Sequence, residues 1–329
     1  MKKIQLLAIF CIAAVLVFAP AHAVVKKTAQ TGLQFLKVDV GARASAMGGS
    51  YSMIGGDATA MFYNPAGLAR MEQKFHFFAT QTKWLAGISY KAFGLAYNAG
   101  AWGTFGLSGV MSDYGGDIMG TRYDATTQKG YIETGNIDVA GRAIGLSYAK
   151  TLTNKFTIGG QIKLCHQNLG DNLLPNGTTQ KNEVSGFAYD FGTIFYPGFK
   201  SFRLGMTIRN FSPEFKYVQD GFELPLTFTL GVAMDVMDFL GEHRDPLVVS
   251  VDAQHPRDYT ERVNVGAEYT WMDMLSARVG YKFNHDVEGL TGGFGVKYNT
   301  GPVGFEIGYA YSDCEYFDAV NRVTVGIWF

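Results

Sequence analysis

Two stretches near the N-terminus decide the fold: GARASAMGG at residues 41–49 and GGDATAMFYNPAGLAR at residues 55–70. After Met71 the chain changes character and reads as a series of β-hairpins that ends in an aromatic residue, Phe329. A compact helical plug followed by an antiparallel β-barrel is typical of outer-membrane proteins.

Side-chain capping predicts how the second stretch folds. Asp57 can accept hydrogen bonds from the free N–H groups of a short helix over residues 58–63. Pro65 ends that helix, because it lacks an N–H donor and pushes Asn64 out of the helical region. Asn64 can in turn cap a second turn that begins at Pro65. We therefore expect a kinked plug of small residues.

The first residues indicate export. Two lysines precede an apolar run over residues 6–18, and AHA at residues 21–23 is a small-x-small cleavage site. The run is shorter than the roughly 20 apolar residues that a spanning helix needs. We expect a signal peptide over residues 1–23 and a mature chain that begins near Val24.

Charge and cysteine content exclude several classes of protein. Removing the signal peptide takes away Lys2 and Lys3 but no acid, so 28 basic residues fall to 26 against 29 acidic ones. This balance carries no nucleic-acid footprint. The mature chain keeps only Cys165 and Cys314, which cannot build a disulfide framework. The sequence leaves open whether these two cysteines pair.

An alternation with a period of two dominates the chain after Met71. In VGFEIGYAYS at residues 303–312, larger apolar or aromatic side chains alternate with small, polar or charged ones. A soluble sandwich would show the same pattern. The strand candidates are longer than the five or six residues typical of globular strands, and tilted bilayer-spanning strands need about nine to eleven. Aromatic residues also gather at the strand ends, as interfacial girdles do.

We therefore predict an all-β fold: a transmembrane antiparallel β-barrel of about 14 strands over residues 73–329. Residues 24–72 form an N-terminal extension and helical hatch. The longer polar links at residues 115–136, 170–182 and 212–223 should lie outside the cell, with the protein in a Gram-negative type of outer membrane. The barrel contacts outer-membrane lipid.

The last strand carries an assembly pattern. One face of this strand presents a row of apolar side chains that ends on an aromatic residue: Val323, Val325, Ile327 and Phe329. The outer-membrane barrel-assembly machinery recognises this pattern in barrel proteins generally. We expect this row to be the barrel-assembly signal.

No enzyme motif survives its context. DFG at residues 190–192 and HRD at residues 243–245 imitate kinase signatures, but their order is reversed and no matching lysine motif is present. The histidines have no metal-ligand spacing. We expect no catalytic, cofactor-binding or metal site, and therefore no enzyme. The barrel parity instead points ten charged side chains inward: Arg203, Arg209, Asp235, Asp252, Arg262, Glu268, Arg278, Lys282, Lys297 and Glu306.

The N-terminal motif resembles a known group of barrels. The motif residues are Gly41, Arg43, Met47, Gly48, Asp57, Asn64, Pro65, Ala66, Gly67 and Leu68. They resemble the N-terminal region shared by the FadL family of hydrophobic-compound transporters and the PorV/PorQ family of type IX secretion. Both are fourteen-stranded barrels with an N-terminal hatch. Residues 31–38 and 82–90 resemble PorV/PorQ-type members more than FadL proper.

The resemblance implies two functions. A PorV/PorQ-like barrel is a non-catalytic component of protein secretion, with the secretion translocon or secreted sorting-domain cargo as partners, and it takes part in attaching that cargo to the cell surface. A FadL-like barrel admits long-chain fatty acids or other hydrophobic small molecules. The charged inward positions favour the first reading, because they suit a rigid, salt-bridged lumen better than an apolar conduit.

Overall fold

The computed structural model describes residues 30–116, 118–240 and 245–329. The signal peptide expected over residues 1–23 lies outside these ranges. None of the helices within them is long and apolar enough to cross a membrane.

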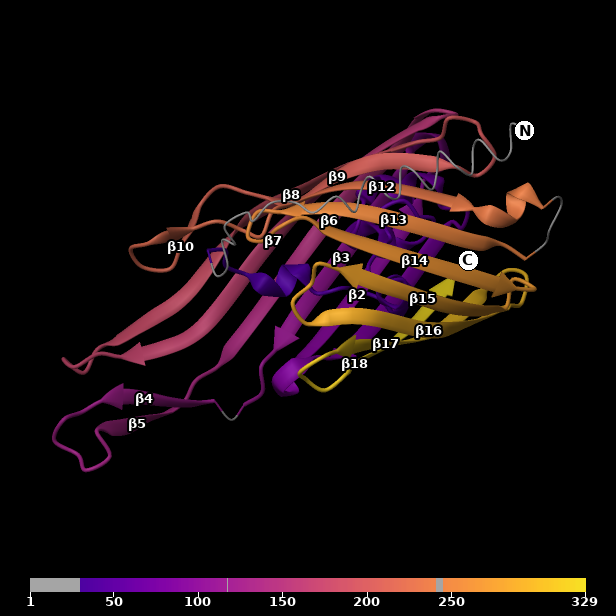
Figure 1. The fold of residues 1–329 in the computed structure, drawn as a ribbon. Helices are drawn as coiled ribbons and strands as arrows, with labels where there is room; N and C mark the ends of the chain where they lie inside the picture. Colours follow the sequence, from indigo (N-terminus) through magenta and orange to yellow (C-terminus); the bar gives the residue numbers. More distant parts are fainter. Residues whose placement is uncertain (1–29, 117, 241–244) are drawn as a thin grey trace.

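Fourteen of the described strands close into one antiparallel barrel, which confirms the expected fold (Figure 1). β1 and β18 form the seam, in register from His76 opposite Trp328 to Lys83 opposite Asn321. The wall strands are β1 (Phe75–Lys83), β2 (Ser89–Asn98), β3 (Thr104–Asp113), β6 (Val139–Thr153), β7 (Phe156–Leu173), β8 (Thr179–Phe195), β9 (Arg203–Phe211), β12 (Thr227–Asp235), β13 (Leu247–Pro256), β14 (Arg262–Trp271), β15 (Leu275–Phe283), β16 (Glu288–Asn299), β17 (Gly304–Cys314) and β18 (Val320–Trp328).

The two ends of the barrel differ in the length of their connections. Phe75 and Phe329 meet at one end, where the backbone N–H of Phe75 donates to the Phe329 carbonyl at 2.8 Å. The opposite end carries two additional hairpins, β4 (Met119–Tyr123) with β5 (Tyr131–Asn136) and β10 (Phe215–Lys216) with β11 (Gly221–Phe222). Outer-membrane barrels have short periplasmic turns and long extracellular loops, so the hairpin end faces outward.

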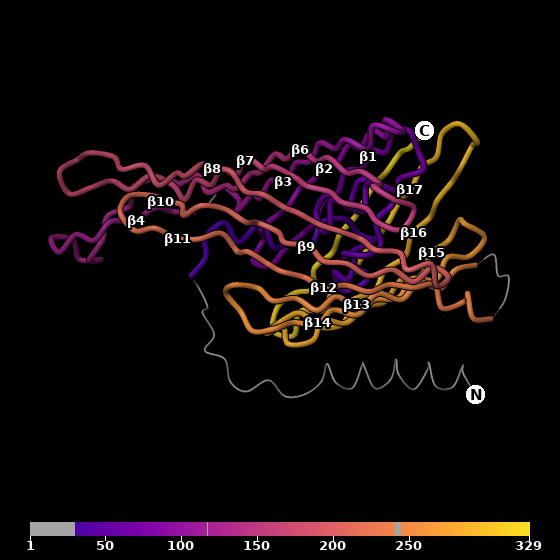
Figure 2. The backbone as a smooth tube through the Cα atoms, turned by 90° about the horizontal axis from the view of Figure 1, so that it is seen from above, coloured from indigo at the N-terminus to yellow at the C-terminus, as the bar shows by residue number. Residues whose placement is uncertain are grey.

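One expected link is wrong. Residues 170–182 continue the β7 and β8 ladder instead of forming a loop, with pairing as far as Leu173 opposite Thr179 beyond an irregularity after Asn168. This extension projects well past the rest of the wall (Figure 2). Polar side chains on both faces hide the alternation there, while the backbone hydrogen bonds of the hairpin continue.

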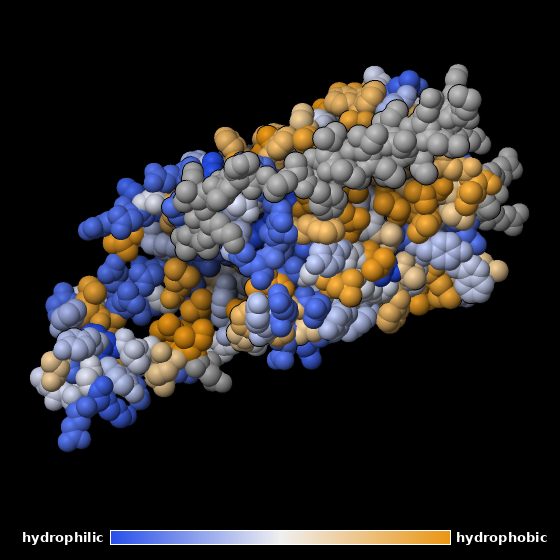
Figure 3. Space-filling model, viewed as in Figure 1, coloured by the Kyte–Doolittle hydropathy of each residue, from blue (hydrophilic) through white to orange (hydrophobic). Residues whose placement is uncertain are grey.

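Side chains alternate across the wall as the sequence predicts. Val279 and Ile307 are exposed on the outer face, whereas Arg278 is buried in the lumen. Val323, Val325 and Phe329 of the terminal row are also exposed, on the same outer face of β18 and its end. Figure 3 shows hydrophobic side chains over much of the barrel wall and mostly hydrophilic ones over the projecting hairpins.

The hatch fills the lumen with four short helices: η1 (Gln34–Lys37), α2 (Ala42–Ala46), η2 (Ala58–Phe62) and η3 (Pro65–Arg70). Both expected caps are present. The Asp57 carboxylate accepts the Thr59 N–H at 2.9 Å, and the Asn64 side-chain oxygen accepts the Ala66 N–H at 3.0 Å. The kinked plug is therefore confirmed, as 3₁₀ turns on either side of Asn64.

Glycines at inward-facing positions of the wall strands let the hatch backbone approach the wall closely. A Cβ atom on Gly159 would overlap the Ala66 backbone nitrogen, and one on Gly192 would overlap the Asn64 side chain. On the opposite wall, a Cβ atom on Gly293 would lie 2.7 Å from the Ala46 Cβ of α2. The inner wall is thus shaped for the hatch backbone.

Gly159 and Gly160 are neighbours in β7, but only Gly159 lies against the hatch, so adding a methyl group to each should affect stability differently. Gly159→Ala should lower the free energy of unfolding by about 1–3 kcal/mol, because it overpacks the contact with η3. Gly160→Ala is the matched control, since its Cβ atom would lie 3.6 Å from the Asp190 carbonyl oxygen, an ordinary contact. Urea titration in lipid vesicles measures both. Equal stability of the two variants would contradict the close contact between β7 and the hatch.

Candidate functional site

A buried ion network joins the hatch to the wall. The Arg43 guanidinium binds both carboxylate oxygens of Glu268, at 2.6 Å from Nη2 and 2.9 Å from Nε. Arg278 binds the same carboxylate at 2.6 Å. On its other side, Arg43 contacts Asp57 at 3.0 Å, and the Tyr51 hydroxyl donates to that carboxylate at 2.5 Å. The helix cap Asp57 is therefore also part of the attachment to the barrel.

Further polar contacts fix the hatch along its length. Lys282 lies between Asp39 and Glu288, at 2.7 and 2.6 Å. Asp252 accepts the backbone N–H groups of Tyr51 and Ser52 at 3.1 and 3.0 Å. Each of these contacts satisfies a buried polar group, which would otherwise be costly in the lumen.

The inward-facing charges predicted from sequence are largely confirmed. Arg203 and Arg209 donate to the backbone carbonyls of Met53 and Phe62 in the hatch. Asp235 behaves differently, because it lies at the periplasmic end of β12, where it caps η6 (Val236–Phe239) by accepting the Met237 N–H. The other positions lie in or beside the lumenal network: Asp252, Arg262, Glu268, Arg278, Lys282, Lys297 and Glu306.

The motif residues of the hatch cap its short helices and pack against one another and against the wall. Asn64 also donates to the Thr193 carbonyl at 3.3 Å, and Leu68 and Met47 are fully buried. Gly67 lies against Gly55, with the Gly56 N–H donating to the Gly67 carbonyl at 2.9 Å. Gly41 lies against the Thr59 side chain of the hatch, whereas Gly48 lies against the β15 backbone at Tyr281, and Pro65 and Ala66 lie against Gly159 of β7. The motif thus builds the plug.

An apolar cap covers the outer end of the lumen. Leu33 and Phe35 are buried in one cluster with Phe215 of β10 and with Leu224, which follows β11. Gly32 lies so close to the Phe222 ring that a Cβ atom there would overlap it. The hatch therefore begins inside an apolar core that fills the outer part of the lumen, where Phe35 packs over Gly141 of β6.

Asp258, in the extracellular turn between β13 and β14, fastens this end of the hatch. Its carboxylate accepts from the Thr31 hydroxyl at 2.8 Å and from Lys37 Nζ at 2.9 Å. Burial acts to raise the pKa of this carboxyl, but the hydrogen bond and charge of Lys37, together with hydrogen bonds from Thr31 and Gln34, lower the pKa below its usual value. The sequence carried no signal for this contact, because the two sides lie more than 200 residues apart.

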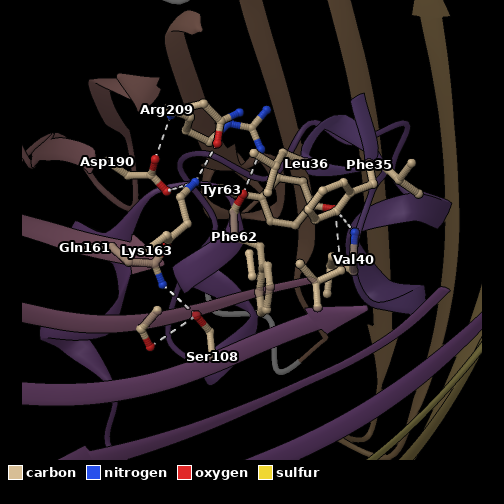
Figure 4. A pocket seen from close by; sticks show the side chains of 15 residues that line it. Phe35, Leu36, Val40, Phe62, Tyr63, Ser108, Gln161, Lys163, Asp190 and Arg209 are labelled. Atoms are coloured by element: carbon tan, nitrogen blue, oxygen red, sulfur yellow. Dashed lines mark hydrogen bonds and ion pairs between the residues drawn. The ribbon is translucent and has the colours of Figure 1, made fainter. Parts of the chain in front are cut away.

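A cavity lies between the hatch and the wall (Figure 4). Its apolar side includes Phe35, Leu36 and Val40, and its polar side includes the ion pair of Lys163 with Asp190 at 2.8 Å. Asp190 belongs to the DFG tripeptide that imitates a kinase signature, and in the structure it pairs with Lys163 inside the lumen.

The cavity is small. The volume open to the centre of a water-sized sphere is about 30 Å³. One water needs about 10–15 Å³ of such volume, so the cavity has room for a few water molecules and none for a long-chain fatty acid.

The described residues hold no cluster of three or more metal-ligating side chains. Cys165 and Cys314, whose pairing the sequence left open, are both free and buried.

Removing the central carboxylate should destabilise the hatch and the wall together. Glu268→Gln leaves Arg43 and Arg278 buried without their shared anion and should lower the free energy of unfolding by about 3–5 kcal/mol. Glu261→Gln is the control, because Glu261 pairs with His255 at the surface, 3.3 Å away, where about 0–1 kcal/mol is expected. Urea titration in lipid vesicles compares them. A Glu268→Gln loss no larger than that of the control would contradict the attachment.

The barrel and its hatch resemble solved structures of outer-membrane transporters. The similar solved structures include the toluene transporter TodX of Pseudomonas putida, with a TM-score of 0.56 and 15% identity, over 88% of this chain and 97% of that one. They also include a FadL homologue of Pseudomonas aeruginosa, with a TM-score of 0.51 and 12% identity, over 88% of this chain and 96% of that one. At these identities the likeness shows the fold alone. No curated protein matches the chain.

The sequence also matches a family model. Residues 126–313, over half of the chain, match the model described as type IX secretion system membrane protein PorP/SprF. This region runs from the β4–β5 hairpin to the end of β17. The chain therefore belongs to the PorP/SprF family of type IX secretion system membrane proteins.

Proposed function

We propose that this protein is a non-catalytic outer-membrane component of type IX secretion, which keeps its lumen closed and offers its extracellular hairpins to other proteins. The family match supports the secretion context. The observation that carries the proposal is the filled lumen, in which Arg43, Glu268 and Arg278 fasten the hatch to the wall. A barrel closed in this way serves as a platform and does not conduct a substrate through its centre.

The projecting hairpins supply the proposed contact surface. Tyr123 on β4 is 80% exposed, and Met119 on the same strand is 51% exposed. Arg122 donates to the Leu174 carbonyl at 2.9 Å, which ties the β4–β5 hairpin to the tip of the β7–β8 hairpin. Exposed aromatic and methionine side chains on a braced surface suit protein binding. We propose sorting-domain cargo or translocon subunits as the partners.

The finer assignment to a PorV/PorQ-like role in surface attachment is also a proposal. It rests on the resemblance of residues 31–38 and 82–90. Residues 31–38 lie in the extracellular cap, and residues 82–90 span the turn between β1 and β2. Two further proposals concern biogenesis: export through a cleaved peptide over residues 1–23, and recognition of Val323, Val325, Ile327 and Phe329 by the barrel-assembly machinery.

Transport of hydrophobic compounds is the alternative function. The similarity to TodX and to a FadL homologue supports it at the level of the fold. The apolar side of the cavity also suits a hydrophobic ligand. The small volume of the cavity favours the secretion proposal, because a fatty acid would have to displace the hatch to bind.

Shortening the β4–β5 hairpin tests whether the protein binds secretion partners through this hairpin. Replacing residues 119–136 by a short turn should abolish co-purification of cargo or translocon subunits while the barrel still assembles, since these residues lie outside the wall ladder. The measurement is affinity purification from membranes, with assembly checked by the heat-modifiable band.

A fatty-acid assay completes this experiment. The intact protein should bind a labelled long-chain fatty acid weakly or not at all. Tight binding that Asn64→Ala with Pro65→Ala abolishes, together with no protein partner for the intact chain, would replace the secretion proposal with the transport function.

A further inference from the structure

The two ends of the hatch lie at opposite ends of the barrel. At the hairpin end, the Gly32 N–H donates to the Glu223 carbonyl at 3.1 Å, and Thr31 binds Asp258. At the other end, the Asn98 side chain donates to the Met71 carbonyl at 2.5 Å, beside the turn between β2 and β3. The hatch therefore runs the whole length of the lumen.

The connections of the wall identify which end is outside. Met71 is followed by Glu72 and, within a few residues, by β1, which begins at the end where both barrel termini meet. The hairpins β4–β5, β7–β8 and β10–β11 extend from the end where Thr31 lies. Short turns are periplasmic and long loops extracellular in this class of barrel.

We infer that the hatch passes through the barrel from the cell surface to the periplasm, so that Gln30, the first described residue, is accessible from outside the cell. This inference goes beyond the proposed function and does not depend on it. It follows that Gln30, at the N-terminal end of the hatch, is a point that extracellular molecules can reach, together with β10–β11 and the β13–β14 turn.

The contacts at the outer end of the hatch oppose any movement of the hatch out of the lumen toward the periplasm. Leu33 and Phe35 are each 1% exposed, and Phe35 fills the space over Gly141 on the inner wall. Lys37 adds its ion pair with Asp258. Withdrawing the hatch toward the periplasm would break this apolar cap and unpair a buried charge, both of which cost free energy.

Cysteine accessibility tests the inference on full-length protein in intact cells. Gln30→Cys and Glu72→Cys place single exposed thiols at the two ends of the same hatch. A membrane-impermeant maleimide should label Gln30→Cys in intact cells but should label Glu72→Cys only after the outer membrane is permeabilised. Thr179→Cys at the tip of β7–β8 is the extracellular reference. The unmodified protein gives the background, because Cys165 and Cys314 are buried.

Each outcome is decisive once the heat-modifiable band shows that every variant has folded. Labelling of Gln30→Cys to the level of Thr179→Cys in intact cells supports the inference. Labelling of Gln30→Cys only after permeabilisation, or not at all, overturns it. Labelling of Glu72→Cys in intact cells also overturns it, because the two ends would then not be separated by the membrane.

Discussion

The structure depends on close contact between the hatch backbone and glycines of the inner wall. Gly159 and Gly192 leave space for Ala66 and Asn64 on one side of the barrel, and Gly293 leaves space for Ala46 on the other. A Cβ atom at any of these positions would overlap the hatch, so the glycines set how closely η3 and α2 approach the wall. The contacts also bring the polar groups of the hatch within hydrogen-bonding distance of the charged residues on the strands.

Electrostatic pairing follows from that contact. Arg43 reaches Glu268 of β14 from α2, which packs against β15, β16 and β17. Asp57 both caps η2 and accepts the Tyr51 hydroxyl. Several lumenal charges are thus paired with one another or with the hatch backbone, whereas the fully buried Arg322 donates to the Ser312 hydroxyl of the wall. Such a lining supports a closed platform, consistent with a secretion component more than with an apolar conduit.

Sequence predicted the parts of the fold that local rules control. The period of two placed Val279 outside and Arg278 inside, and capping rules identified Asp57 and Asn64. Long-range contacts escaped it, because nothing local pairs Lys37 with Asp258. The extension of β7 and β8 was missed because polar side chains cover both faces of that hairpin outside the membrane. The resemblance pointed to the secretion context, but the matched family is PorP/SprF, and a PorV/PorQ-like role remains a prediction.

Conductance tests the central claim that the hatch closes the barrel. The purified, folded protein is inserted into planar lipid bilayers, and single-channel current is recorded at moderate voltage, with insertion verified by the heat-modifiable band of protein recovered from vesicles. The account predicts no steady ion current, because the hatch is fastened at both ends and along its length. A stable open channel in the intact protein would contradict it.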